Sequence, residues 1–326
     1  MLERRERGML RPGVHKRWSQ KFVVRELAKC VFYPAGREEE FERINRNCIA
    51  ALQAYAGQEM VQSFPMTDVE GLRLLRAAVY DTLTKDQLAQ QEIAIGFLYL
   101  LRYEQIWHGR ELSRLRAGTV SRQTEDFSRT AERIAAAFSL GWVHQATALA
   151  EAALLLLPRH AYWTADPQLV AGQPAFRMPF PRFVLRLYAD FAGRAMPDPM
   201  PRHPYEAPVY DTLLAVWRSS DPAALTEPLL AVCDWHTHEC MYRRSMDPGR
   251  RVDFGFDIYM GWPIEVLMVY RLRKELGLRN PSQLDHPLMQ TALAAYLPPW
   301  PMPQDDLLDR VTQRALKQYP ALAEFV

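Results

Sequence analysis

The stretch DQLAQQEIAIGFLYLLRYEQIW, residues 86–107, is rich in apolar residues and contains few residues that break helices. Its apolar positions include Leu88, Ile95, Leu98, Leu101 and Ile106. An apolar stripe with helical spacing is typical of an α-helix that packs one face against a core. The stretch therefore predicts a helix, and similar patterns recur along most of the chain.

Two further stretches show the same helical pattern. Phe127, Ala131, Ile134 and Phe138 recur at intervals of four, three and four, which places them on one helix face. EEEFERINRNCIAALQAYAGQEM, residues 38–60, begins with acidic residues, which the helix dipole favours in a first turn. Runs of alternating β-branched residues are almost absent. The sequence therefore predicts an all-α fold of about eleven or twelve helices.

Proline marks the predicted division of the chain. Ten of the 24 prolines lie between Pro158 and Pro208, and proline interrupts helices. We therefore expect an N-terminal helical half, residues 18–157, and a C-terminal helical half, residues 209–326. A proline-rich connection, residues 158–208, would join them and contain a short helix near 182–194. The basic residues 1–17 are interpreted as a flexible tail.

Composition limits the classes of function. Lys plus Arg (40) nearly balances Asp plus Glu (38), which gives no reason to expect nucleic acid or an anionic membrane as a partner. The first 17 residues lack the apolar core of a signal peptide. The apolar residues 134–150 include Gly141 and His144, so they predict a buried helix pair rather than a membrane span. Four scattered cysteines fit free thiols in a reducing cytoplasm.

DWHTHEC, residues 234–240, resembles a metal site at first sight. On a helix, His236 and Cys240 share a face, but His238 points elsewhere. Traced backwards, that face carries Leu229 and Cys233, an apolar series. We therefore interpret it as a core stripe that contains one satisfied histidine and two small buried thiols. A zinc site with a distant third ligand and a Cys–His nucleophile pair remain as alternatives.

Helix ends are well marked in the C-terminal half. Asp221-Pro222 predicts a helix start, and Thr226 predicts the next one. Pro263 predicts the start of a central helix with Glu265 in its first turn, and Gly277 predicts its end.

DDLLD, residues 305–309, matches the DDxxD pattern of all-helical isoprenoid synthases. Asp305, Asp306 and Asp309 could hold Mg²⁺ and a diphosphate on one helix face. The same aspartates suit the N-terminus of a last amphipathic helix, and no second acidic motif follows. We favour the structural interpretation and retain a Mg²⁺-dependent enzyme as the alternative. GxSxG, GxxxxGK[ST] and HExxH motifs are absent from the sequence.

The C-terminal part of the chain resembles a known class of protein. It reads DWHTHECMYRRSMDPGRRVDFGFDIYMGWPIEVLMVYRLRKELGL, followed by DHPLM and YLPPW. A polar helix, a loop with a D-P pair, a W-P-hydrophobic-E helix and a late LP follow one another. Across residues 229–299 this resembles helical immunity proteins of bacterial polymorphic-toxin and type VI secretion effector–immunity pairs.

The resemblance implies a cytoplasmic binding protein with no catalysis and no cofactor of its own. It would neutralise a cognate toxin encoded by an adjacent gene, by blocking the toxin's active site or a required motion. A nuclease is the first expectation for that toxin. The charge balance and the apolar pattern predict no direct nucleic-acid partner and no membrane, and apolar helices exposed in either half would favour a homodimer. A helical scaffold or regulator with a non-toxin partner is a further alternative.

The residues expected to contact a partner lie in irregular, charged segments. One segment is the polar loop 247–257, and the other is the proline-rich connection. An ordinary solvated connection is the alternative for the loop. The expected contact residues are Arg250, Arg251, Asp253, Asp257, Trp163 and Arg202.

Overall fold

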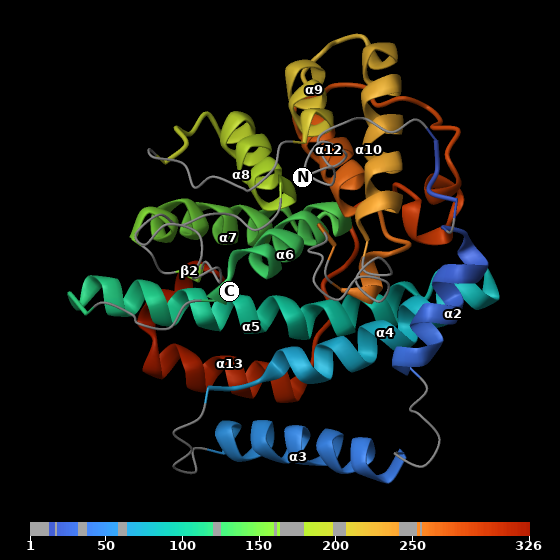
Figure 1. Ribbon diagram of the computed structural model, residues 1–326. Coiled ribbons are helices and arrows are strands. Elements are labelled where there is room, and N and C mark those ends of the chain that lie inside the picture. The colour runs from blue at the N-terminus through green and yellow to red at the C-terminus, as the bar shows by residue number, and fades with distance from the viewer. Residues whose placement is uncertain are drawn as a thin grey trace, which may run out of the picture. The chain divides into compact units, whose positions relative to one another are not determined.

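The computed structural model describes residues 13–16, 18–31, 38–57, 64–119, 125–159, 162–163, 179–197, 207–240, 253–254 and 256–326. These residues contain eleven α-helices (Figure 1), which confirms the predicted all-α fold. Two strands of two residues each, β1 (Glu125–Asp126) and β2 (Tyr162–Trp163), pair in parallel. No helix within the described ranges is long and apolar enough to cross a membrane.

The chain forms two compact units. The first unit comprises residues 1–23 and 122–298, and the second comprises residues 24–121 and 299–326. Helix α2 (Gln20–Val31) begins in the first unit and continues into the second. The proline-rich connection, residues 158–208, falls inside the first unit. The reason is that α6 (Phe127–Leu140), which precedes it, packs on α12 (Ile264–Glu275), which follows it.

The second unit is built around α5 (Gln90–Arg116), which contains most of the predicted helix 86–107. This helix packs along α4 (Thr67–Lys85) and also contacts α13 (Asp306–Gln318), as Figure 1 shows. The short 3-10 helix η6 (Pro320–Glu324) covers another part of α5. Helix α3 (Glu38–Ala56) packs on α13 and α4. Leu98, Leu101 and Ile106 are buried, as the sequence predicts.

Glycines allow α4 and α5 to approach closely. A Cβ atom added to Gly96 of α5 would lie 2.7 Å from the backbone nitrogen of Leu75 in α4. A Cβ atom added to Gly71 of α4 would lie 2.9 Å from the backbone nitrogen of Leu100 in α5. Any larger residue at these positions must push the two backbones apart, because real Cβ atoms do not approach backbone atoms so closely.

Gly96→Ala is expected to lower the free energy of unfolding by about 1–2 kcal/mol. Overpacking costs about 1–3 kcal/mol, and the gain in helix propensity offsets at most about 1 kcal/mol. Urea denaturation monitored by circular dichroism measures the change. Gln91→Ala, at an exposed position of the same helix, is the control and should leave stability nearly unchanged. A stabilised Gly96→Ala variant would contradict the close approach of α4 and α5.

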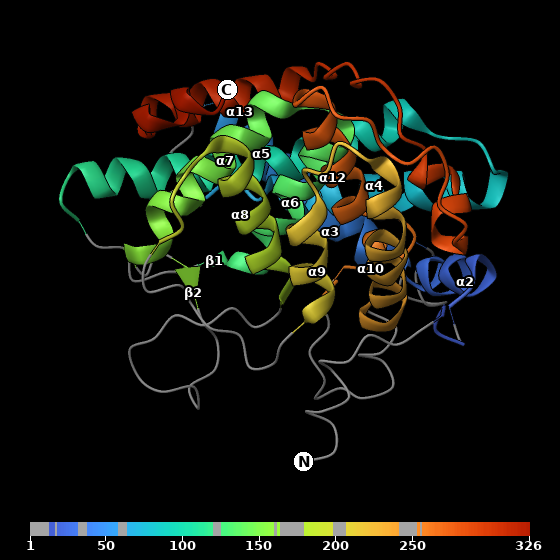
Figure 2. The ribbon, with the colours of Figure 1, turned by 90° about the horizontal axis from the view of Figure 1, so that it is seen from above.

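The first unit has two central helices, α6 and α12, whose middle residues are buried on every side. Helices α8 (Pro179–Ala192), α9 (Pro208–Val216) and α10 (Thr226–Glu239) lie side by side (Figure 2). The four apolar residues predicted to share one face, Phe127 to Phe138, are all buried in α6. Helix α7 (Val143–Leu156) follows α6 after a turn at Gly141, so the predicted buried helix pair is confirmed.

The predicted helix ends are also confirmed in the first unit. The Asp221 side chain accepts a hydrogen bond from the Ala223 N–H at the start of the 3-10 helix η2 (Pro222–Leu225). Helix α12 ends at Glu275, and Gly277, two residues later, has a φ of +72°. The Leu278 N–H then donates to the Arg273 carbonyl at 2.8 Å, a closing bond that a left-handed glycine makes possible.

Candidate functional site

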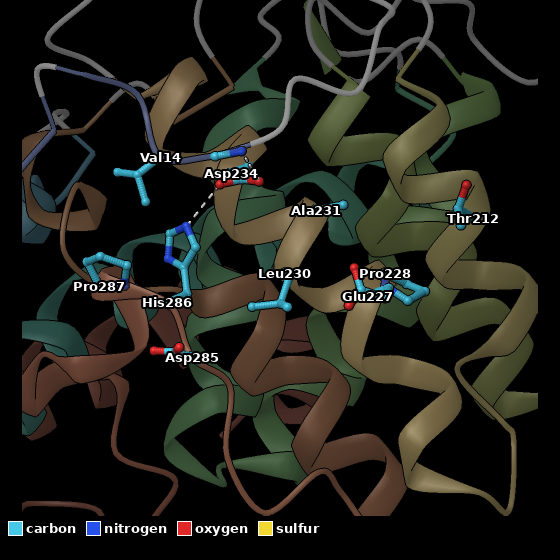
Figure 3. Close-up of a pocket in the computed structure, with 11 residues that line it drawn as sticks. Val14, Thr212, Glu227, Pro228, Leu230, Ala231, Asp234, Asp285, His286 and Pro287 are labelled. Carbon is cyan, nitrogen blue, oxygen red and sulfur yellow. Dashed lines mark hydrogen bonds and ion pairs between the residues drawn. The ribbon is translucent and has the colours of Figure 1, made fainter.

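An open pocket lies in the first unit beside helix α10 (Figure 3), with a volume of about 590 Å³. That size falls within the range of about 300–1,000 Å³ found for ligand sites. Helix α10 contributes one face to the pocket, and Thr212 of α9 lies across from it. The segment before the 3-10 helix η4 (Pro287–Gln290) and the N-terminal segment at Gly13 and Val14 complete it. The α10 residues are Glu227, Pro228, Leu230, Ala231 and Asp234.

Asp234 and His286 connect three of these segments through hydrogen bonds. The Gly13 N–H donates to Asp234 Oδ2 at 2.9 Å, and His286 Nε2 lies 3.2 Å from Asp234 Oδ1. His286 Nδ1 accepts the Leu288 N–H at 3.1 Å, so the neutral ring carries its proton on Nε2 and donates it to Asp234. Burial lowers the pKa of His286, which favours this neutral form. Asp234 is therefore held in one orientation.

The opposite face of α10 is fixed in the core by His236. Its Nε2 lies 2.7 Å from the Tyr259 carbonyl oxygen, and its Nδ1 lies 2.8 Å from Glu265 Oε1. A carbonyl oxygen only accepts, so Nε2 carries a proton, and a second proton lies between Nδ1 and Oε1. Both side chains are fully buried. This confirms the interpretation of His236 as a core residue.

Asp253 is a second buried anchor for α10. Its Oδ2 accepts a hydrogen bond from Trp235 Nε1 at 2.5 Å, and its Oδ1 accepts one from the Phe180 N–H at 3.2 Å. Burial raises the pKa of Asp253 to about 8, and the Trp235 hydrogen bond opposes that rise. Asp253 thus joins α10 to the start of α8, two elements that stand on either side of α9.

The structure corrects the expectation that Asp253 and Asp257 of the polar loop 247–257 contact a partner. Asp253 and Asp257 are 1% and 2% exposed, so neither carboxylate lies on a contact surface. Asp253 turns inward because Trp235 and Phe180 supply the two donors that its buried oxygens need. Arg250, Arg251 and Arg202 lie outside the described residues. Only the backbone of Trp163 is described, in strand β2.

The residues suggested by the sequence as metal ligands do not form a metal site in the described part of the chain. Cys240 is fully buried, and its Sγ lies 3.7 Å from the Thr237 carbonyl oxygen. Asp305 caps α13, because its Oδ1 accepts the Leu308 N–H at 2.8 Å. Asp306 and Asp309 are exposed on the first turn of that helix. Within the part of the chain that is described, no three His, Cys, Asp or Glu side chains are grouped to hold a metal ion.

Asp305→Ala tests the capping role of DDLLD directly. The loss of the cap is expected to lower the free energy of unfolding by about 1 kcal/mol. The thermal stability of the wild-type protein and the variant, measured with and without Mg²⁺ and inorganic diphosphate, separates the two interpretations. A stabilisation by Mg²⁺ and diphosphate that Asp305→Ala abolishes would restore the enzyme alternative. Asp306→Asn, which keeps the cap, is the matched control.

Asp234, His286 and Gly13 were not predicted as site residues. Asp234 and His286 both lie within the stretches quoted for the resemblance, DWHTHEC and DHPLM, but no spacing rule joins positions so far apart. Gly13 falls in the region interpreted as a flexible tail. Residues 13–16 instead lie against α10, since the His15 N–H donates to Thr237 Oγ1 at 3.2 Å and the rings of His15 and His238 contact edge to face.

No protein-family model, curated protein or solved structure matches this chain.

Proposed function

We propose that this protein is an immunity protein that binds a cognate toxin, with a nuclease as the favoured class of toxin, and blocks its activity. The observation that carries the proposal is the pocket beside α10, which is open to solvent and held in a fixed shape. Four chain segments build it, and hydrogen bonds from Gly13 and His286 hold Asp234 in place. Pre-organised surfaces of this kind lose little conformational entropy when they bind.

Neither His236 nor His286 is free to act as a general base. A general base needs a free lone pair within reach of its substrate. His286 uses one ring nitrogen to accept the Leu288 N–H and the other to contact Asp234. His236 is likewise engaged through both nitrogens and is fully buried. The pocket therefore offers shape, apolar surface and charge, which are the properties that a protein partner recognises.

The position of the pocket supports the same proposal. The resemblance to helical immunity proteins spans residues 229–299, and that range contains Leu230, Asp234, Asp285 and His286 of the lining. The segments that carry the resemblance are thus the ones that build most of the pocket. A cytoplasmic partner protein is part of this proposal.

Co-expression with the product of the adjacent gene tests the proposal. We expect that product alone to arrest bacterial growth, and we expect co-expression of this chain to restore it. The two proteins should also elute together from an affinity column when only one carries a tag. A toxic neighbour that this chain neither binds nor neutralises would overturn the proposal. Binding without rescue would instead favour a scaffold or regulator.

A further inference from the structure

Three carboxylates surround the pocket beside α10. Glu227 and Asp285 are exposed at its rim, whereas the Asp234 side chain is only 14% exposed. Leu230 and Ala231 lie between Glu227 and Asp234 on the same face of α10 and provide an apolar wall. Figure 3 shows the carboxylates on different sides of the opening. A ligand in the pocket therefore meets negative charge from more than one side.

The described residues that line the pocket include no cationic side chain that could pair with these carboxylates. None of its described residues is Lys or Arg, and His286 is neutral because its Nδ1 accepts a backbone N–H. A cleft lined by one sign of charge concentrates the field that a partner encounters. The formal net charge of the whole chain is +2. The acidic pocket is thus a local feature that the overall charge balance conceals.

We propose that this pocket binds a basic, partly apolar segment of the partner protein through its arginine or lysine side chains. The inference rests on the proposed function and identifies the chemistry of the contact. Arginine and lysine combine an apolar stem with a charged head. The stems would lie along Leu230 and Ala231, and the heads would face Glu227, Asp234 and Asp285.

Asp234 is suited to anchor such a cation. Each of its oxygens already accepts one hydrogen bond, from His286 or from Gly13, and a carboxylate oxygen can accept a second. Its orientation is therefore set before the partner arrives. In a nuclease, basic segments contact the phosphates of the nucleic acid. A pocket that occupies such a segment would block substrate binding without contacting nucleic acid itself.

Fluorescence polarisation with the full chain tests this inference without the toxin. The probe is a labelled peptide of alternating arginine and leucine, and the comparison peptide has glutamate in place of arginine. We expect only the arginine peptide to bind, and more weakly in 300 mM than in 50 mM NaCl. Glu227→Gln/Asp285→Asn should weaken binding at least about threefold, as the loss of two exposed charge pairs implies.

The control has the same change in charge. Glu275→Gln/Glu92→Gln alters two exposed carboxylates outside the pocket and should change the affinity less than twofold. Equal weakening by both double variants would overturn the inference, as would equal binding of both peptides. Binding of the arginine peptide only after removal of residues 1–12 would also overturn it, because the chain's own basic residues would then be the occupant.

Measurements of toxin binding and neutralisation distinguish a failure of this inference from a failure of the proposed function. If Glu227→Gln/Asp285→Asn slows association with the toxin and the control pair does not, both stand. If the double variant neutralises the toxin with an unchanged association rate, the inference fails and the proposed function survives. If the chain binds the arginine peptide but no toxic neighbour, the proposed function fails and the cation pocket remains.

Discussion

Replacing Glu265 with alanine is expected to lower the free energy of unfolding by about 3–5 kcal/mol, because the change leaves a buried ring nitrogen unpaired and opens a cavity in the core. The carboxylate is fully buried and lies 2.8 Å from His236 Nδ1. Without it, Nδ1 loses its hydrogen-bond partner. Urea denaturation followed by tryptophan fluorescence measures the loss.

Glu265→Gln separates the hydrogen bond from the charge. The glutamine amide can donate to Nδ1 of a neutral His236, while Nε2 still donates to the Tyr259 carbonyl oxygen. We therefore expect Gln to restore most of the stability that Ala removes. Glu275→Ala, at the exposed end of α12, controls for the loss of a glutamate. A loss below about 1 kcal/mol in Glu265→Ala would contradict a structural role for the pair.

Asp253→Asn is expected to reduce the dependence of stability on pH. The unfolded carboxyl group has a pKa of about 3.9, whereas burial raises the folded pKa to about 8. Between these values the folded state binds a proton that the unfolded state lacks. The contribution of Asp253 to stability is therefore complete below the unfolded pKa and is lost as the pH rises through the folded pKa. Its slope is at most about 1.4 kcal/mol per pH unit.

The measurement is a series of urea denaturation curves at pH 5, 6, 7 and 8. The wild-type protein should lose stability over this range more steeply than Asp253→Asn does. The asparagine amide must face either the Trp235 or the Phe180 donor, so the variant should also carry a pH-independent cost of about 1–3 kcal/mol, which adds to the pH-dependent difference from the wild type. Asp285→Asn, an exposed change, is the control. Parallel curves for wild type and Asp253→Asn would contradict a raised pKa.

Local signals in the sequence predicted much of the fold. Asp221, Asp305 and Gly277 each act within a few residues of their own position, and the structure confirms all three as cap residues. The sequence also predicted the apolar face of α6, because the spacing of apolar residues along a helix is a local pattern. His236 was recognised as a core residue for the same reason, although its partner Glu265 comes from another helix.

Local patterns in the sequence did not predict the pocket. Asp234, Gly13 and His286 meet only in the folded first unit, and none of them stands out by spacing. The prediction of Asp253 as a contact residue was wrong, because a charged residue in a polar stretch of sequence usually remains exposed to solvent. Its burial depends on two donors, Trp235 and the Phe180 backbone, that no local pattern reveals. Predicting the site therefore requires knowledge of tertiary contacts, whereas the helices are predicted from local patterns.

The second unit is assembled from two segments that are far apart along the chain. Helix α5 is covered in part by α13 and η6, and Gln105 Nε2 donates to the Phe325 carbonyl oxygen at 2.6 Å. During synthesis, residues 122–298 must leave the ribosome after α5 and before α13. At about 5–20 residues per second, this interval is on the order of ten seconds or more.

Throughout that interval the apolar surface of α5 that α13 and η6 will cover has no partner from its own unit. All residues of the first unit have been synthesised before α13 and η6 emerge. A chaperone that shields α5 would act in this window. A chain truncated before residue 299 keeps every residue that lines the acidic pocket but lacks α13 and η6, which cover part of α5.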